Sequence, residues 1–146
     1  MDHPDSDGLL AEQLLRLTRR LHRAQKRRLE PLGITPAQSR LLRAVAQYDT
    51  PPRMADVAAR LEVVPRAVTT LVDGLEAAER IRRVPDPANR RVIRLELTDG
   101  GRDTLRALRD ARRGAAEEIL APLDAAQREV LGGLLTSLVN GTDLRC

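Results

Sequence analysis

Between residues 54 and 75, apolar side chains recur at the spacing that places them on one face of a helix. The first set consists of Met54, Val57, Ala58 and Leu61. After a three-residue joint, Pro65 fits the first turn of a second helix, where its missing N–H group is no loss. The inward positions of this second helix are Val68, Leu71, Val72 and Leu75. The pattern therefore predicts two short helices joined by a turn at 62–64.

The opposite face of the helix that starts at Pro65 is short, basic and hydroxylated. It carries Arg66, Thr69, Thr70 and Asp73. Such a face suits a helix that lies in the major groove of DNA, because arginine binds guanine edges and threonine meets base edges or thymine methyl groups. An ordinary solvated helix face has the same residue types. This face alone leaves both interpretations open.

Beyond these helices the spacing of apolar residues changes to that of strands. Residues 81–84 and 91–97 are β-branched or alternating, and the segment 85–90 between them contains two prolines that cannot join a β ladder. The sequence therefore predicts a β-hairpin with a stiff, projecting tip that holds Arg90 and Arg91. Guanidinium groups in this place suit a narrow minor groove, although exposed hairpin arginines also serve solubility alone.

Helices are predicted on both sides of this segment. Thr35 and Gln38 form a capping box that begins one helix, which should pack under the helix from Pro65. Its apolar positions are Leu41, Leu42 and Val45. Thr98 begins a long helix after the hairpin, and Asp124 begins the last one. The order of elements is that of a winged helix-turn-helix, so the predicted fold class is mainly α with a small β-hairpin wing.

The first and last helices carry more leucine than a small DNA-reading module needs. Their apolar stripes are Leu10, Leu14, Leu17 and Leu21 in the first helix, and Leu131, Leu134, Leu135 and Leu138 in the last. We expect the terminal helices of two subunits to interlock here, which sets two recognition helices about 34 Å apart on successive major grooves. A monomer that hides these leucines internally has the same periodicity. The predicted parts are a dimerisation helix at 1–34, a DNA-binding lobe at 35–98 and dimerisation helices at 99–146.

Charge and composition favour duplex DNA as the partner. The chain has 146 residues, a net charge of +4 and a sequence pI near 10.4, and Lys26 is its sole lysine. Arginine forks suit phosphate and guanine, but a chain rich in Ala, Arg and Leu also arises from a GC-rich genome. Tyr48 is the only aromatic residue, so the sequence lacks the stacking platform of single-strand binders.

No motif indicates catalysis, a metal site or a bound cofactor. His3 and His22 are not at metal-ligand spacing, no glycine-rich phosphate loop is present, and the single cysteine, Cys146, has no histidine or cysteine cluster around it. No apolar run approaches the roughly 20 residues of a membrane span, and no secretory segment begins the chain, so we expect a cytoplasmic protein. The rival interpretation is a helical protein-interaction module whose basic hairpin serves only solubility.

Four segments resemble the MarR family of bacterial transcription regulators. They read MADVAARL from Met54, PRAVTTLVD from Pro65, PDPANRR from Pro85 and LTDGG from Leu97. The resemblance covers nearly the whole chain and implies a homodimer on an inverted-repeat DNA site. It places the helix from Pro65 in the major groove and Arg90 or Arg91 in the minor groove. It also implies a repressor and a small-molecule effector, which no residue of this sequence identifies.

The chain departs from the family's pattern at four positions. Glu62 replaces the usual turn glycine. Val64 replaces the Ser or Thr cap before the proline, and the loss of this cap lowers stability by about 1 kcal/mol. Glu79 stands where glycine commonly closes the recognition helix, and Asn89 stands where the wing usually has Asp beside its arginines. Asp86 is left to brace the wing. These departures bear on the geometry of DNA reading more than on the fold.

Overall fold

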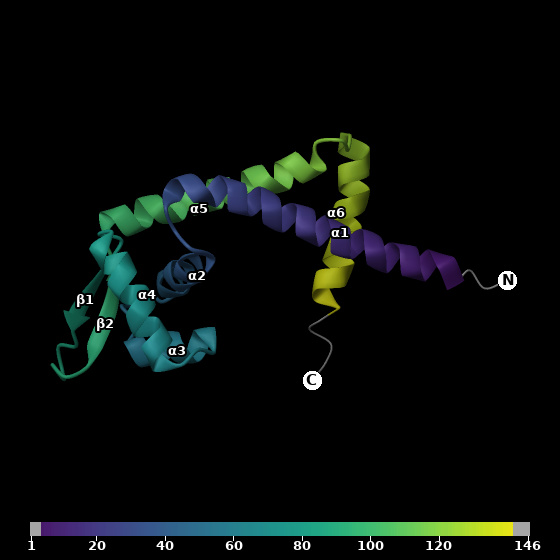
Figure 1. The fold of residues 1–146 in the computed structure, drawn as a ribbon. Coiled ribbons are helices and arrows are strands. Elements are labelled where there is room, and N and C mark those ends of the chain that lie inside the picture. The colour runs from purple at the N-terminus through teal and green to yellow at the C-terminus, as the bar shows by residue number, and fades with distance from the viewer. Residues whose placement is uncertain (1–3, 142–146) are drawn as a thin grey trace. The chain divides into compact units, whose positions relative to one another are not determined.

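The computed structural model describes residues 4–141, and the structure is mainly helical with one two-stranded hairpin (Figure 1). The elements are α1 (Pro4–Leu29), a 3-10 turn (Glu30–Leu32), α2 (Pro36–Ala46), α3 (Met54–Leu61), α4 (Pro65–Ala77), β1 (Ile81–Pro85), β2 (Ile93–Leu97), α5 (Asp99–Leu120) and α6 (Ala125–Asn140). The predicted fold class is confirmed. His3 and Cys146 lie outside the described residues.

Contacts within the chain divide it into two compact units. One is Lys26–Arg112, which contains α2, α3, α4 and the hairpin. The other joins Met1–Gln25 to Arg113–Cys146, of which residues 4–25 and 113–141 are described. Of the described helices, none is long and apolar enough to cross a membrane.

The core of the Lys26–Arg112 unit is built from the inward positions that the sequence predicted. Its almost wholly buried side chains include Leu41, Leu42, Val57, Val68, Val72, Leu75, Ile81 and Leu95. They come from α2, α3, α4 and both strands, which confirms that α2 packs under α4. Full burial of such a side chain contributes about 1.5–3 kcal/mol to folding. The core therefore gives α4 a rigid platform.

The predicted helix starts are confirmed by their hydrogen bonds. The Gln38 N–H donates to Thr35 Oγ1 at 3.1 Å, and the Thr35 N–H donates to the Gln38 side chain at 3.1 Å. The same reciprocal pair, at 2.8 and 3.0 Å, begins α6 at Asp124. Thr98 Oγ1 accepts the Gly101 N–H at 3.0 Å, which caps the start of α5.

The two strands pair antiparallel, but their ends differ from the prediction. The expectation that Pro85 stays out of the ladder is wrong, because it ends β1 opposite Ile93. A proline is tolerated at such a position when no N–H of its own is needed. The second strand was expected to start at residue 91, but β2 starts at Ile93. The Val92 N–H donates to the Asn89 carbonyl at 2.9 Å, which closes a turn in place of a strand.

Two glutamates hold backbone conformations that favour glycine. Glu62, at the end of α3, has φ of 54°, and Glu79, just after α4, has φ of 57°. This left-handed conformation costs an L-residue about 1–2 kcal/mol. Val64 supplies no side-chain cap to α4, as predicted from its apolar side chain. The chain therefore keeps the backbone of a tight helix-turn-helix and carries strain where glycine would relieve it.

The terminal unit exposes most of the leucines predicted for dimerisation. Leu10, Leu14, Leu17, Leu134, Leu135 and Leu138 are exposed, whereas Leu21 and Leu131 are half-buried. The exposed fraction is 60% for Leu14 and 59% for Leu134. Within a single chain these apolar side chains stay in water, which is unfavourable. The internal packing expected of a monomer does not cover them.

Candidate nucleic-acid interface

The outer face of α4 presents the residues predicted for the major groove. Pro65, Arg66, Thr69, Thr70 and Asp73 are all exposed. The Thr69 hydroxyl donates to the Pro65 carbonyl at 3.2 Å, and the Thr70 hydroxyl donates to the Arg66 carbonyl at 3.2 Å. Because the helix backbone takes these protons, the threonines offer acceptor oxygens and methyl groups outward. These groups suit base amino groups and thymine methyls.

The start of α4 is open to an anion. Val64, the N-cap residue before Pro65, gives the first turn no side-chain hydrogen bond, although its carbonyl accepts the Ala67 N–H at 3.0 Å. The first N–H groups of a helix have no acceptor within the helix, and a phosphate oxygen is a suitable partner for them. Pro65 leaves one fewer such donor to satisfy. The missing cap, unfavourable for the free protein, therefore fits a helix that meets a phosphate.

Arg83, in β1, joins the hairpin to α4. Its Nη2 donates to Asp73 Oδ1 at 2.5 Å, its Nη1 donates to Glu76 Oε1 at 2.8 Å, and its backbone N–H donates to Glu76 Oε2 at 3.1 Å. The hydrogen bond with Asp73 is the main cause that raises the pKa of Arg83 above its ordinary value. Asp73, expected at the DNA-reading face, is thus also engaged by the hairpin. Sequence reasoning did not identify Arg83 or Glu76.

Asp86 is buried and organises the turn of the hairpin. Its Oδ1 accepts the N–H of Ala88 at 2.8 Å and that of Asn89 at 3.2 Å, and its Oδ2 accepts Arg94 Nε at 2.5 Å. The Ala88 N–H, and then the Arg94 guanidinium, lower the pKa of Asp86. The Asn89 side-chain oxygen accepts the Arg91 N–H at 3.1 Å. Side chains therefore set the shape of the turn.

The hairpin is also fixed to the segment before α3. Arg94 Nη1 donates to the Pro51 carbonyl at 2.7 Å, and the Leu95 N–H donates to the Pro52 carbonyl at 2.8 Å. Arg53 and Arg94 form an isolated antiparallel bridge beside these bonds. No sequence pattern indicates this contact, since the two segments lie some forty residues apart. These bonds tie the second strand of the hairpin to the segment before α3.

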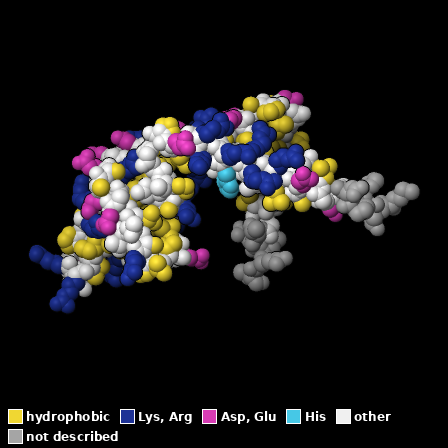
Figure 2. Space-filling view, in the orientation of Figure 1, with side chains coloured by type: hydrophobic (Ala, Val, Ile, Leu, Met, Phe, Trp, Pro, Cys, Tyr) yellow, Lys and Arg dark blue, Asp and Glu magenta, His cyan; other side chains and the backbone are white. Residues whose placement is uncertain are grey.

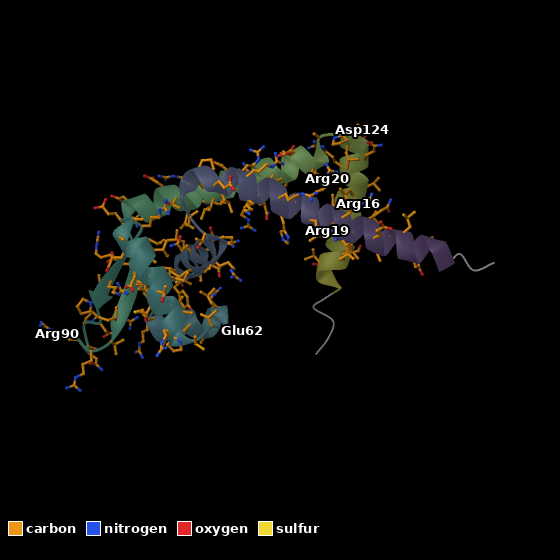
Figure 3. The ribbon with its side chains drawn as sticks, in the orientation of Figure 1. Arg16, Arg19, Arg20, Glu62, Arg90 and Asp124 are labelled. Carbon is orange, nitrogen blue, oxygen red and sulfur yellow. The ribbon has the colours of Figure 1, made fainter. Side chains whose placement is uncertain are left out.

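Arg90 and Arg91 lie at the tip, where both are exposed. Arg90 points away from the rest of the hairpin (Figure 3). Figure 2 shows basic side chains projecting from this end of the molecule. Within residues 4–141, neither guanidinium has a carboxylate partner. The tip therefore offers two positive charges on a turn whose shape is fixed.

A second basic feature lies between α2 and α5, inside the Lys26–Arg112 unit. A cavity of about 400 Å³ is lined by Arg43, Ala46, Gln47, Leu105, Leu108, Arg109 and Arg112. An adjoining hollow of about 370 Å³ shares Arg43 and Arg112 and adds Arg40 and Arg60. Burial, and then the charges of Arg112 and Arg40, lower the pKa of Arg43. None of the residues that line either hollow is acidic.

The described part of the chain holds no group of three or more His, Cys, Asp or Glu side chains placed to bind a metal ion. The features that stand out are instead the exposed face of α4, the basic tip of a braced hairpin and the arginine-lined cavity. Exposed guanidinium and hydroxyl groups can bind phosphates and base edges.

Comparisons with known proteins identify relatives of this arrangement. The sequence pattern of the MarR family matches residues 32–92. The HTH-type transcriptional repressor MdtR of Bacillus subtilis is 35% identical over 99 residues, which are 66% of this chain. The match spans 63% of MdtR, less than two thirds of its length. YhbI of the same bacterium, an uncharacterized HTH-type transcriptional regulator, is 30% identical over 142 residues, 91% of this chain and 90% of YhbI.

A solved structure shares the fold. The crystal structure of the Mycobacterium tuberculosis MarR family protein Rv2887, in complex with DNA, is similar with a TM-score of 0.70 and 27% sequence identity. The similarity covers 88% of this chain and 96% of that one. A protein of similar fold has thus been crystallised with DNA.

Proposed function

Because this chain belongs to the MarR family of transcriptional regulators, we propose that it binds double-stranded DNA sequence-specifically as a homodimer and acts as a repressor. Its DNA site is an inverted repeat, and its place of action is the cytoplasm. The observation that carries the proposal is the combination of an exposed polar face on α4 with a braced hairpin whose tip arginines are unpaired. Neither feature alone would support DNA binding over an ordinary solvated surface.

In this proposal α4 enters the major groove and the hairpin tip enters the adjacent minor groove. Arg66 binds a guanine edge, and the threonine methyl groups contact thymine. Arg90 and Arg91 place guanidinium groups where a narrow minor groove concentrates negative potential. Pro65 sets the start of the helix, where the open N–H groups meet a phosphate.

A second copy of the chain covers the exposed leucines of the terminal helices. α1 and α6 present apolar side chains to solvent in the single chain, among them Leu14 and Leu134. An isologous contact between two such surfaces gives a two-fold dimer. Two-fold symmetry then matches the inverted repeat, with the two α4 helices about 34 Å apart.

The repressor assignment has a simple physical basis. A dimer seated on two successive major grooves occupies DNA that RNA polymerase would otherwise use. The relative MdtR is a repressor by its name. The sign of regulation is therefore proposed by analogy, while the DNA-binding surface is proposed from this chain's own residues.

The arginine-lined cavity supports regulation by a small-molecule effector with an acidic group. Burial, and then the charges of Arg112 and Arg40, lower the pKa of Arg43, so an anion between these arginines would relieve repulsion that the free protein carries. Leu105 and Leu108 offer apolar surface beside these charges. Benzoate is a suitable first probe and uncharged benzyl alcohol its control. Benzoate should raise the melting temperature of the protein and not that of an Arg43→Gln variant.

The experiment that tests DNA binding compares Arg66→Ala and Arg90→Ala with the unchanged protein by fluorescence anisotropy. Each substitution should weaken specific binding about tenfold or more, the effect of losing one good contact. Arg90→Ala should also reduce the salt dependence, since one fewer counterion is released. Arg106→Ala, which removes an exposed arginine of α5 paired with Asp103, is the matched control. Unchanged affinity for both variants, with the dimer intact, would favour the protein-interaction module instead.

A further inference from the structure

The two elements proposed to contact DNA, α4 and the hairpin, lie side by side (Figure 1). The side chain of Arg83 joins them. Its two terminal nitrogens donate to different carboxylates of α4, that of Asp73 at 2.5 Å and that of Glu76 at 2.8 Å. The Arg83 N–H donates to the second oxygen of Glu76 at 3.1 Å. Asp73 and Glu76 are about one helical turn apart. One guanidinium therefore spans a turn of α4 and holds β1 against it.

This arrangement depends on the shape of arginine. The guanidinium is a planar fork of fixed N–H donors, whereas the lysine ammonium is a point charge on a flexible stem. A lysine at position 83 can pair with Asp73 or with Glu76, but it cannot fix the angle between β1 and α4 as the fork does. Arginine is thus the residue type that sets an orientation as well as a charge.

The exposure of the three side chains indicates that the bridge contributes little to stability. The exposed fraction is 25% for Arg83, 42% for Glu76 and 62% for Asp73. Ion pairs this open to solvent add little to the free energy of unfolding. The core beneath them already fixes the fold. The effect left to the bridge is on the position of the hairpin relative to α4.

Asp73 gives the bridge a second role. It lies on the α4 face proposed to meet DNA, where a free carboxylate would repel the phosphates. Pairing with Arg83 offsets the negative charge of Asp73 on this face of α4. The same contact therefore removes an unfavourable charge from the reading face and sets the place of the hairpin.

From these contacts we infer that Asp73 and Glu76 are positioning residues that act through Arg83. They fix the distance between Arg66 on α4 and Arg90 at the hairpin tip, so that the major-groove and minor-groove contacts form together. The inference rests on the proposed DNA-binding function. Its consequence is energetic coupling: without the bridge, the hairpin samples more positions, and Arg90 contributes less to binding.

A double-mutant cycle on duplex DNA measures this coupling. The variants are Arg90→Ala, Arg83→Gln and the two combined, each checked for its melting temperature and oligomeric state. Arg90→Ala should weaken binding about tenfold in the unchanged protein and only about threefold or less with Arg83→Gln present. Arg83→Lys should give an intermediate coupling. The matched control is Arg106→Gln, whose exposed pair with Asp103 lies on α5, and its combination with Arg90→Ala should be additive.

The outcomes separate this inference from the proposed function. If Arg90→Ala weakens binding equally with and without Arg83, the hairpin is positioned independently of the bridge, and the inference is wrong while DNA binding stands. If Arg90→Ala has no effect on binding in the unchanged protein, Arg90 does not contact the minor groove. Both that part of the proposed function and the coupling to Arg83 are then wrong.

Asp73→Asn distinguishes positioning from base reading. A positioning role predicts weaker binding to all sequences and a smaller effect of Arg90→Ala in this background. A base-reading role predicts a changed preference at one base pair with the coupling to Arg90 intact, and that result would overturn the inference. The melting temperature should change little, because Asp73 is exposed.

Discussion

The buried carboxylate of Asp86 and the guanidinium of Arg94 meet at 2.5 Å, and this pair ties the turn of the wing to its second strand. Arg94 also donates to the Pro51 carbonyl at 2.7 Å, so the pair links the wing to the segment before α3. The turn that carries Arg90, which we propose as a DNA contact, is thus shaped by residues other than those proposed to contact DNA.

The acid sensitivity of the protein should depend on Asp86. The pKa of Asp86 is lowered in the folded chain. The carboxylate therefore adds to the free energy of unfolding above the ordinary carboxyl pKa of about 3.9, and this stabilisation is lost as pH falls through the lower pKa of the folded state. Urea unfolding of the protein and of Asp86→Asn, at pH 7 and at about pH 3, measures this loss. The unchanged protein should lose more stability on acidification than the variant. Equal losses would mean that Asp86 does not contribute.

Glu62→Gly should stabilise the protein, because glycine adopts the left-handed conformation that Glu62 holds at φ of 54° without steric cost. The expected gain is about 1 kcal/mol in the free energy of unfolding. Ala59→Gly, in the exposed interior of α3, is the control and should cost about 1 kcal/mol. Denaturant unfolding measures both. A loss of stability in Glu62→Gly would show that its side chain outweighs the strain.

Gly101→Ala should destabilise the fold, because an added Cβ would lie 2.0 Å from the Arg80 carbonyl oxygen. The backbone must shift to make room, at a cost of about 1–3 kcal/mol. Gly8→Ala serves as the control, since its added Cβ meets nothing within 4 Å. The control should be neutral or stabilising in thermal unfolding. Equal melting temperatures for Gly101→Ala and the unchanged protein would contradict the close packing of α5.

Leu14→Glu should dissociate the dimer that we propose. The charge would be buried against the second copy, where an unpaired carboxylate is strongly unfavourable. Light scattering should report the mass of one chain for this variant and of two for the unchanged protein. The control is Val63→Glu, an exposed apolar position outside the terminal helices. A dimer that survives Leu14→Glu would place the interface elsewhere.

Interactions between neighbours in the sequence were predictable, and those between distant residues were not. The capping boxes at Thr35 and Asp124 were predicted because both partners lie within one turn of a helix. The contact of Arg83 with Asp73 was not, since it depends on how the hairpin lies against α4. Likewise, nothing in the sequence placed Arg43 beside Arg112, which belongs to another helix.

The strand ends and two backbone conformations were likewise not predictable from the local sequence. The proline at position 85 was expected to stop the strand, but a proline at a strand end needs no N–H donor of its own. Glu62 and Glu79 were recognised as departures from glycine, yet their sequence alone did not reveal that the backbone keeps the left-handed conformation. At these positions the packing of the core determines the backbone conformation against the local preference of glutamate.

Specific binding of this protein to duplex DNA is measured by fluorescence anisotropy. The protein is titrated onto the intergenic DNA upstream of its own gene and onto a shuffled duplex of equal length, at several salt concentrations. We predict nanomolar binding to the native duplex and a preference of about a thousandfold over the shuffled one. Absence of binding to both duplexes at low salt would show that the protein does not act on duplex DNA.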